Sequence, residues 1–332
     1  MGAMLPRRLF LCACAAAGFA GMAALLHRAL PWRVPEVTQK VNFLRAHAGD
    51  FDTVFIGSSR IYHGVSPRAF DAAMAAAGQP AHSFNLAVNA LLPPESMWMA
   101  RTLSAMKLPR LRRVFLEMAD ARDIPDADHP TVRDVYWQDP EALAYAWQRA
   151  RQDLAAAPPE QRWTRALGEL SRGTTLFAFN ELNVGWLIPT PRWEPVSGRR
   201  EPVLGPDGDG FLPIRHTLLE GARAKLAEGI DALRRQTVVR TVDPLNEQEY
   251  AGIQRMLNAR GVEVILLMAP VTVRDYHAWQ DAPPGSRVLA FDDPDRHPEF
   301  YDPAHRFDSD HLNEAGAEIF SKELAEAYLA GK

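Results

Sequence analysis

Apolar residues in this chain form short continuous runs separated by amphipathic stretches. Residues 52–57 read Asp-Thr-Val-Phe-Ile-Gly, a run of β-branched and aromatic residues that ends on a glycine. Runs of this length and composition predict strands that are buried on both faces. The strands expected on this basis are residues 52–57, 82–88, 113–118, 262–268 and 287–291.

Helices are expected between these runs. Ser66-Pro67 has the pattern of an N-cap followed by proline in the first turn, and Gly78 and Pro80 would end that helix. The other predicted helices are residues 37–48, 94–106, 244–260 and 314–329, the last with Asn313 as N-cap. Alternating strands and helices predict an α/β fold, a three-layer α/β/α sandwich with a parallel central sheet. Active sites of such folds lie at the carboxyl ends of the strands.

The alternation is interrupted between about residues 121 and 240, where the sequence becomes helical and irregular and contains several tryptophans. We interpret this stretch as a largely helical insertion that builds a lid or a substrate wall, with an independent second domain as the alternative. The predicted organisation is an N-terminal segment at 1–30, a linker and short helix at 31–50, and an α/β domain at 51–332 that contains the insertion.

The N-terminal segment has the pattern of a membrane helix. Residues 9–26 contain no charged side chain, and a helix of that length is about 27 Å long, enough to cross a bilayer core. We expect a single-pass anchor in the cell membrane, with the rest of the chain on the periplasmic or other extracytoplasmic side. A cleaved signal sequence is the alternative interpretation, because Arg7-Arg8-Leu9-Phe10-Leu11 resembles a twin-arginine export signal. Both cysteines, Cys12 and Cys14, lie in this segment, so the remaining chain tolerates an oxidising compartment.

The overall composition excludes some classes of function. Apolar residues make up 47% and charged residues 23% of the chain, which is the balance of a globular protein. The formal net charge is −4, and no long run of Lys and Arg appears. We therefore expect no nucleic-acid partner.

Two short stretches far apart in the chain carry complementary chemistry. Gly57-Ser58-Ser59-Arg60 places hydroxyl groups at the end of the first predicted strand, and Asp308 precedes His311 by three residues near the C-terminus. A serine becomes a nucleophile when a base takes its proton, and the base needs a third group to fix its tautomer. The pattern predicts a serine nucleophile with His311 as base and Asp308 as orienting carboxylate.

Other site chemistries fit this sequence less well. An α/β-hydrolase elbow requires Gly-x-Ser-x-Gly, and Ile61 stands at its second glycine. A metal site must be considered because Asp and His residues crowd 292–311, but they show no recognised ligand spacing. We expect neither a metal nor another cofactor. Asp310 is interpreted as a turn or capping carboxylate.

The motifs resemble those of the SGNH/GDSL hydrolase superfamily, in which a serine follows the first strand and an Asp-x-x-His pair lies near the C-terminus. Phe55-Ile56-Gly57-Ser58-Ser59-Arg60, Phe84-Asn85-Leu86-Ala87 and residues 308–316 look most like its membrane-anchored envelope members. These include proteins of alginate O-acetylation and the D-alanyl transfer protein of lipoteichoic acid synthesis. The resemblance implies a flavodoxin-like sheet, with Ser59 as nucleophile, His311 as base and Asp308 as orienter.

The sequence also departs from the family pattern. Ser58 replaces the usual aspartate before the nucleophile, and Ala87 stands where a glycine amide of the oxyanion hole is expected. The asparagine of the third block is absent, since Glu117-Met118-Ala119-Asp120 ends the third strand. The N–H of Ala87 and the side chain of Asn89 are the predicted oxyanion donors.

The charged neighbours of the nucleophile allow two roles. Arg60 and His63 follow Ser59 closely, so either could contact an anionic substrate. Arg60 could equally form a structural ion pair.

The resemblance implies a serine-dependent O-acyl esterase or O-acyltransferase that forms an acyl-enzyme on Ser59. Its expected substrate is an acylated carbohydrate or an envelope or exported polysaccharide, and a membrane-bound O-acyltransferase is a candidate partner. The alternative is a non-catalytic carbohydrate-binding or assembly module, which the missing asparagine keeps open.

Overall fold

The computed structural model describes residues 4–29, 34–91, 93–119, 132–184, 203–235, 244–272 and 285–331. The chain divides into two compact units, each made of two segments. One unit comprises Met1–Pro35 with Asp123–Val196, and the other comprises Glu36–Arg122 with Ser197–Lys332. The predicted bounds of the insertion, residues 121 and 240, lie outside the described residues.

The second unit is built on a five-stranded parallel sheet in the order β2-β1-β3-β4-β5. Its strands are β1 (Thr53–Ile56), β2 (Ser83–Asn85), β3 (Arg113–Glu117), β4 (Glu263–Met268) and β5 (Arg287–Ala290). Every residue of β1, β2 and β3 is buried, and in β1 and β3 this burial gives the central apolar runs Val54-Phe55-Ile56 and Val114-Phe115-Leu116 rather than an alternating pattern. The predicted α/β fold with a parallel central sheet is confirmed.

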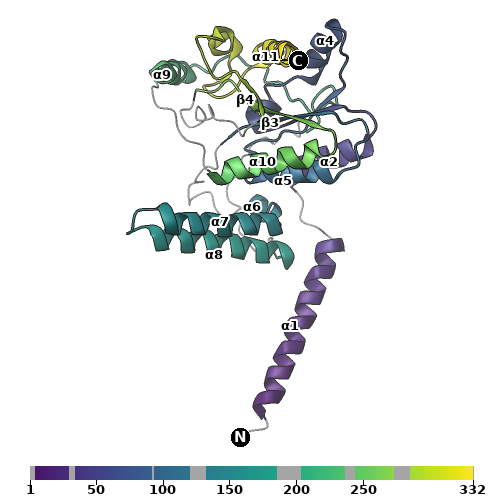
Figure 1. Ribbon diagram of the computed structural model, residues 1–332, viewed down its shortest axis with the longest axis vertical. Coiled ribbons are helices and arrows are strands. Elements are labelled where there is room, and N and C mark those ends of the chain that lie inside the picture. Colours follow the sequence, from purple (N-terminus) through teal and green to yellow (C-terminus); the bar gives the residue numbers. More distant parts are fainter. Residues whose placement is uncertain are drawn as a thin grey trace. The chain divides into compact units, whose positions relative to one another are not determined.

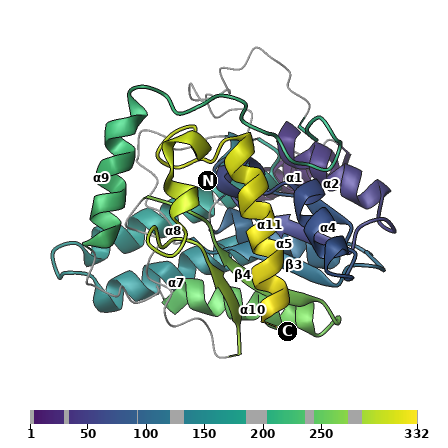
Figure 2. The ribbon, with the colours of Figure 1, turned by 90° about the horizontal axis from the view of Figure 1, so that it is seen from above.

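Helices cover both faces of this sheet, as Figures 1 and 2 show. Helices α4 (Pro67–Ala76) and α11 (Glu314–Ala330) pack together on one face, and α5 (Glu95–Ala105) and α10 (Pro244–Asn258) pack on the other. Helix α2 (Pro35–Ala46) precedes β1. The predicted N-caps are confirmed, because Ser66 Oγ accepts from Ala69 N–H and Asn313 Oδ1 accepts from Gly316 N–H.

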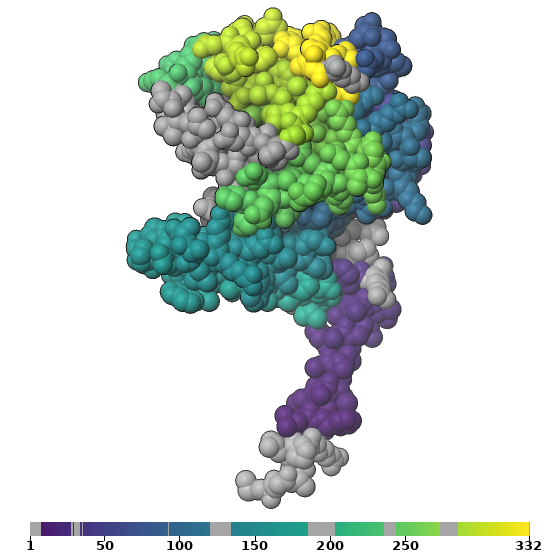
Figure 3. Space-filling model, viewed as in Figure 1, coloured from purple at the N-terminus to yellow at the C-terminus, as the bar shows by residue number. Residues whose placement is uncertain are grey.

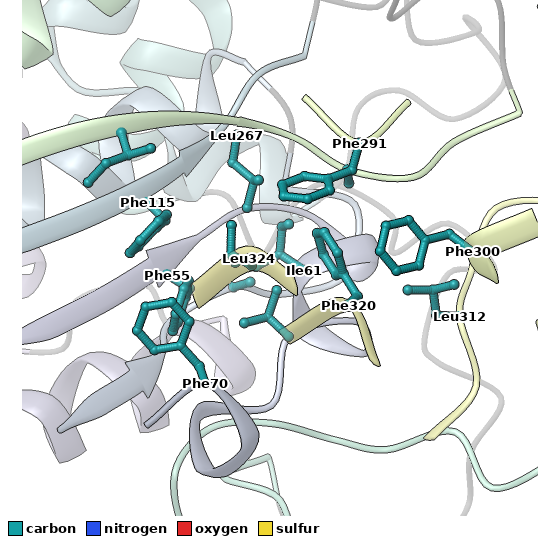
Figure 4. Close-up of a cluster of buried hydrophobic side chains, with 14 of the residues drawn as sticks. Phe55, Ile61, Phe70, Phe115, Leu267, Phe291, Phe300, Leu312, Phe320 and Leu324 are labelled. Carbon is teal, nitrogen blue, oxygen red and sulfur yellow. The ribbon is translucent and has the colours of Figure 1, made fainter. Parts of the chain in front are cut away.

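The main core lies between the sheet and the α4–α11 layer (Figure 4). Phe55, Phe70 and Phe115 form an aromatic cluster with ring centroids 5.0 to 5.4 Å apart. Ile61, in the short helix α3 (Ser59–Tyr62), and Leu312, just before α11, are buried in this same core. The turn that contains Ser59 and the stretch that contains Asp308 and His311 therefore each have a neighbouring residue in the same hydrophobic core.

The first unit contains α1 (Met4–Ala29), α6 (Val132–Tyr136), α7 (Pro140–Ala156) and α8 (Arg162–Glu181). Helices α7 and α8 pack along their length as a hairpin. A Cβ on Gly173 would lie 2.6 Å from the Cβ of Ala146, so a glycine is needed at this crossing. The remaining described helix of the predicted insertion, α9 (Ala222–Arg234), belongs to the second unit.

Helix α1 has the length and composition to cross a membrane between Arg8 and His27. Its apolar side chains, including Phe10, Phe19 and Leu25, are largely exposed (Figure 3). These properties fit both a signal anchor and a signal sequence.

Candidate active site

The carboxyl ends of β1 and β3 form the floor of the candidate site. The chain leaves β1 for β2 on one side and then returns to β3 on the other, so β1 and β3 flank the point where the strand order reverses. Loops diverge at such a switch point and leave room for a ligand. Ser58 and Ser59 follow β1 after the single residue Gly57, and Glu117 is the last residue of β3.

The two serines of the turn after β1 have different roles. Ser58 is the N-cap of α3, and its Oγ accepts from Arg60 N–H. Ser59 is the first residue of that helix, so its N–H has no intrahelical acceptor. No acceptor for this N–H is found among the described residues. The turn therefore presents the Ser59 hydroxyl and amide together, while Ser58 performs the capping.

Ser59, His311 and Asp308 lie together as the sequence predicts. Ser59 Oγ lies 2.7 Å from His311 Nε2, and His311 Nδ1 lies 2.9 Å from both carboxylate oxygens of Asp308. With the proton on Nδ1, the ring donates to Asp308 and accepts the Ser59 hydroxyl proton at Nε2. This arrangement can move a proton from Ser59 to His311 without a change of rotamer.

Asp308 is held as a carboxylate. Burial alone would raise its pKa, but hydrogen bonds from the His311 ring and from the N–H groups of Asp310 and His311 outweigh burial and lower the pKa below its ordinary value. Asp310 makes no contact with the ring, and its Oδ2 instead faces Ser309 Oγ and Lys225 Nζ.

The Asp-x-x-His geometry depends on a closed loop before α11. Arg306 and Leu312 form an isolated antiparallel bridge, and Phe307 N–H donates to the His311 carbonyl. Arg306 is fully buried and donates to the carbonyls of Phe300, Ser309 and Pro270. These bonds fold the chain so that the Asp308 carboxylate lies beside the imidazole of His311, three residues further along the chain.

A buried polar network supports the turn that contains Ser58 and Ser59. Arg60 Nε lies 2.9 Å from Glu117 Oε1, and Ser58 N–H donates to Glu117 Oε2 at 2.5 Å. A Cβ on Gly57 would lie 2.7 Å from the same Oε2, so glycine is needed for Glu117 to approach. The Arg60 side chain is only 8% exposed. The structure thus places Arg60 in a buried ion pair with Glu117, which is the structural role that the sequence allowed.

The two predicted oxyanion donors are placed differently. Ala87 is fully buried, and its N–H donates to Asn85 Oδ1 at 3.1 Å, so this amide is already engaged. This geometry does not support Ala87 as an oxyanion donor. Asn89 is half-buried, and its carboxamide lies 3.1 Å from His63 Nε2. Asp120, the last residue of the predicted third block, lies outside the described residues.

His63 joins Asn89 to the triad. Its ring lies edge-on to that of His311, with centroids 6.1 Å apart, and its Nδ1 lies 2.6 Å from the Leu212 carbonyl. Burial lowers the pKa of His63 to about 4, so the ring is neutral at pH 7. Asn89 Oδ1 is the atom placed next to Nε2. A neutral ring that donates from Nδ1 has a bare Nε2, so this contact becomes a hydrogen bond when the Asn89 carboxamide is turned over and its NH₂ group donates to the ring.

A buried lysine that the sequence analysis did not single out fixes the backbone after β2. Lys40 Nζ donates to the carbonyls of Asn85, Ala87 and Gly210 at 2.5 to 3.0 Å and lies 3.7 Å from the centre of the Tyr62 ring. Burial lowers the pKa of Lys40. Its signal in the sequence is a lysine within the apolar stripe Val37, Val41 and Leu44 of α2.

The acidic and histidine residues of 292–311 do not converge on one point. In the described part of the chain, no three His, Cys, Asp or Glu side chains are placed to hold a metal ion. Asp295 instead pairs with Arg234, His297 with Glu323, and Asp302 caps a short helix.

An open groove of about 450 Å³ adjoins Asp308, and its lining does not include Ser59 or His311. Its walls are the start of α9 and the loop that carries Asp308 and Asp310, and Lys225 stands at its edge. Part of the predicted insertion therefore forms one wall of a groove beside the triad.

Comparisons of this chain with protein-family models, curated proteins and solved structures give no match. The site is therefore assigned from its own geometry.

The neutral state of His63 predicts a pH-dependent stability. Between about pH 6.5, its ordinary pKa, and about pH 4 the unfolded chain binds a proton that the folded chain does not. Stability is lost as the pH falls through this window, by up to about 2 kcal/mol at pH 5. Burial raises the pKa of Asp71 to about 6, which acts in the opposite direction over much of the window, so a difference between variants is needed.

The measurement is the unfolding midpoint of wild type and His63→Gln in detergent at pH 7.5 and pH 5. Wild type should lose more stability on acidification than His63→Gln does, and the exposed His216→Gln is the matched control. Equal losses in wild type and His63→Gln would contradict a buried neutral ring.

Proposed function

We propose that the chain is an SGNH-like serine enzyme that forms an acyl-enzyme on Ser59 and acts as an O-acyl esterase or O-acyltransferase. The observation that carries the proposal is the contact of Ser59 Oγ with His311 Nε2 at 2.7 Å, with Asp308 on the other ring nitrogen. Nucleophile, base and orienting carboxylate are each within hydrogen-bond reach of the next.

The proposed reaction has two halves. Ser59 Oγ attacks the ester carbonyl while its proton passes to His311 Nε2, and the imidazolium then returns that proton to the departing alcohol oxygen. In the second half His311 takes a proton from water or from an acceptor hydroxyl, and the oxygen of that group attacks the acyl carbonyl. The bond from this carbonyl to Ser59 Oγ then breaks, and His311 returns the proton to Ser59 Oγ. Asp308, kept ionised by its hydrogen bonds, stabilises the imidazolium in both halves.

The negative charge on the carbonyl oxygen needs hydrogen-bond donors. The Ser59 N–H at the first turn of α3 is one candidate, because it lies on the nucleophile itself and points away from any intrahelical acceptor. The Asn89 carboxamide, placed beside His63, is the second. Because the Ala87 N–H already donates to Asn85, this oxyanion hole would contain fewer fixed hydrogen-bond donors than the oxyanion hole of the family.

The substrate class is proposed from three features together. The open groove at Asp308 offers a surface beside the proposed site on which part of a larger substrate could lie. The apolar helix α1 supports a site close to a membrane, on its periplasmic or other extracytoplasmic side. The motifs resemble those of envelope proteins, so an acylated carbohydrate or an envelope or exported polysaccharide is the proposed substrate, with a membrane-bound O-acyltransferase as the proposed acyl donor.

The test uses the full-length chain in detergent with p-nitrophenyl acetate. Wild type should release p-nitrophenol, and Ser59→Ala and His311→Ala should each reduce the rate to the background of an enzyme-free sample. An exposed imidazole can itself cleave this ester. His216→Ala, which removes an exposed histidine, is therefore the control for the loss of an imidazole group. Equal rates in wild type and both variants would favour the non-catalytic binding module.

A second arm separates transfer from hydrolysis. An oligosaccharide acceptor is added, and acylated sugar is sought by mass spectrometry. A transferase should yield acylated sugar at the expense of free acetate, whereas an esterase should yield acetate alone.

A further inference from the structure

The α7–α8 hairpin exposes an apolar face with two tryptophans. Trp147 is 49% exposed on α7, and Trp163 and Leu167 are 67% and 57% exposed on α8. Isolated apolar side chains at a protein surface are ordinary, but these belong to a set that recurs at helical spacing. We call this set the tryptophan face, and it consists of Leu143, Trp147, Leu154, Trp163, Leu167 and Leu170.

Both helices present these residues on the same side of the hairpin. Ala142, Ala146 and Ala150 form the buried stripe of α7, and Trp147 is rotated by about 100° from that stripe. Trp163 is rotated by about the same angle, in the same sense, from the buried stripe of α8 around Gly173. Because the helices are antiparallel, equal rotations of the same hand bring side chains to one side.

The other side of the hairpin is polar. Arg149 and Gln152 of α7 and Arg165 and Arg172 of α8 are rotated in the opposite sense from the buried stripes. One side of the hairpin thus carries the exposed tryptophans and leucines, with Arg151 and Glu181 beside them, and the other side carries the guanidinium groups of Arg149, Arg165 and Arg172.

The position of α1 within the same unit identifies what covers the tryptophan face. Helix α1 contacts α8, and Ala23 is the buried residue among the α1 side chains that the structure describes. The apolar span of α1 ends at His27, four residues later, so Ala23 lies about 6 Å inside that end. The hairpin runs crosswise to α1 in Figure 1. A helix that crosses a membrane span at this depth lies at the boundary between headgroups and acyl chains.

We propose that the tryptophan face of the α7–α8 hairpin lies in the lipid bilayer interface beside α1. Trp is enriched at this depth because its ring is apolar while its N–H reaches water or headgroups. The hairpin would then hold the first unit flat on the membrane surface, a contact additional to the anchor. The proposal concerns α1 and the hairpin alone and does not depend on the proposed reaction at Ser59.

The test measures the depth of single positions, because α1 alone would keep any variant on the membrane. In the full-length chain with Cys12→Ala and Cys14→Ala, a nitroxide is attached to Trp163→Cys, Leu167→Cys or Arg165→Cys. The protein is reconstituted into vesicles of phosphatidylcholine and phosphatidylglycerol, and collision with oxygen and with a water-soluble nickel complex is recorded. All three positions are exposed, so these substitutions remove no core packing.

Labels at 163 and 167 should collide several-fold more with oxygen, relative to nickel, than the label at 165 on the polar side. Equal nickel accessibility at all three positions would overturn the proposal, because the face would then lie in water. Protection of 163 and 167 from both reagents would also overturn it, because the face would then be covered by protein, such as a second copy of the chain.

Discussion

Asp308→Asn should lower the rate of acyl-enzyme formation by about 10⁴-fold while leaving the protein folded. Asparagine keeps an oxygen that can accept from the N–H groups of Asp310 and His311, so the loop before α11 is preserved. Its NH₂ group, however, turns the imidazole toward the tautomer that carries its proton on Nε2. That tautomer cannot accept the Ser59 proton, and no carboxylate stabilises the imidazolium.

The matched control is Asp310→Asn, which changes a neighbouring carboxylate that makes no contact with the ring. It should keep the rate within a few-fold of wild type. The rates are compared by stopped-flow release of p-nitrophenol from the full-length chain. Loss of rate in Asp310→Asn with little loss in Asp308→Asn would show that the orienting carboxylate is wrongly assigned.

Glu117→Ala should destabilise the second unit by about 3 kcal/mol, which is the scale for breaking a buried ion pair. It removes the carboxylate that lies 2.9 Å from Arg60 Nε and the acceptor of the Ser58 N–H, and it leaves a cavity beneath the turn. Activity should fall as well, because the same bonds hold the turn that presents Ser59.

The reference variant is Arg68→Ala, whose ion pairs with Glu318 and Asp207 are exposed and should contribute less than about 1 kcal/mol. Replacing the buried pair as a whole, by Arg60→Met with Glu117→Leu, should cost less than Glu117→Ala alone, since no charge is left behind. Urea unfolding followed by fluorescence compares the three. A cost for Glu117→Ala no larger than for Arg68→Ala would contradict a structural role of the network.

The strands and most helices of the second unit could be predicted because buried positions are occupied mainly by apolar residues, and their spacing differs between strands and helices. The core strands are buried on both faces, and this produces the apolar runs that predict them. Ser66 and Asn313 were recognisable as caps because few residue types satisfy the first N–H groups of a helix. Helix α3 was not predicted, since four residues are too few to show a helical period.

The placement of Ser59, His311 and Asp308 side by side was predictable because the proposed chemistry restricts the residue types, even though Ser59 and His311 lie far apart in the chain. The role of Arg60 was not predictable from the sequence, because an arginine side chain at this position can face either solvent or a carboxylate. Its partner is decided by the pairing of β1 with β3, which brings Glu117 beside the turn. The Ala87 amide is engaged because its N–H donates to the side chain of Asn85, a local hydrogen bond that the spacing of the residues does not reveal.

The central claim is that Ser59, and not the adjacent Ser58, is the nucleophile. A fluorophosphonate reacts with an activated serine by forming a bond from Oγ to phosphorus with loss of fluoride, and peptide mass spectrometry locates the adduct. The adduct should form on Ser59 in wild type and be absent in Ser59→Ala and His311→Ala. In Ser58→Ala it should still form, on Ser59. Labelling of Ser58, or equal labelling of Ser59 in the absence of His311, would contradict the account.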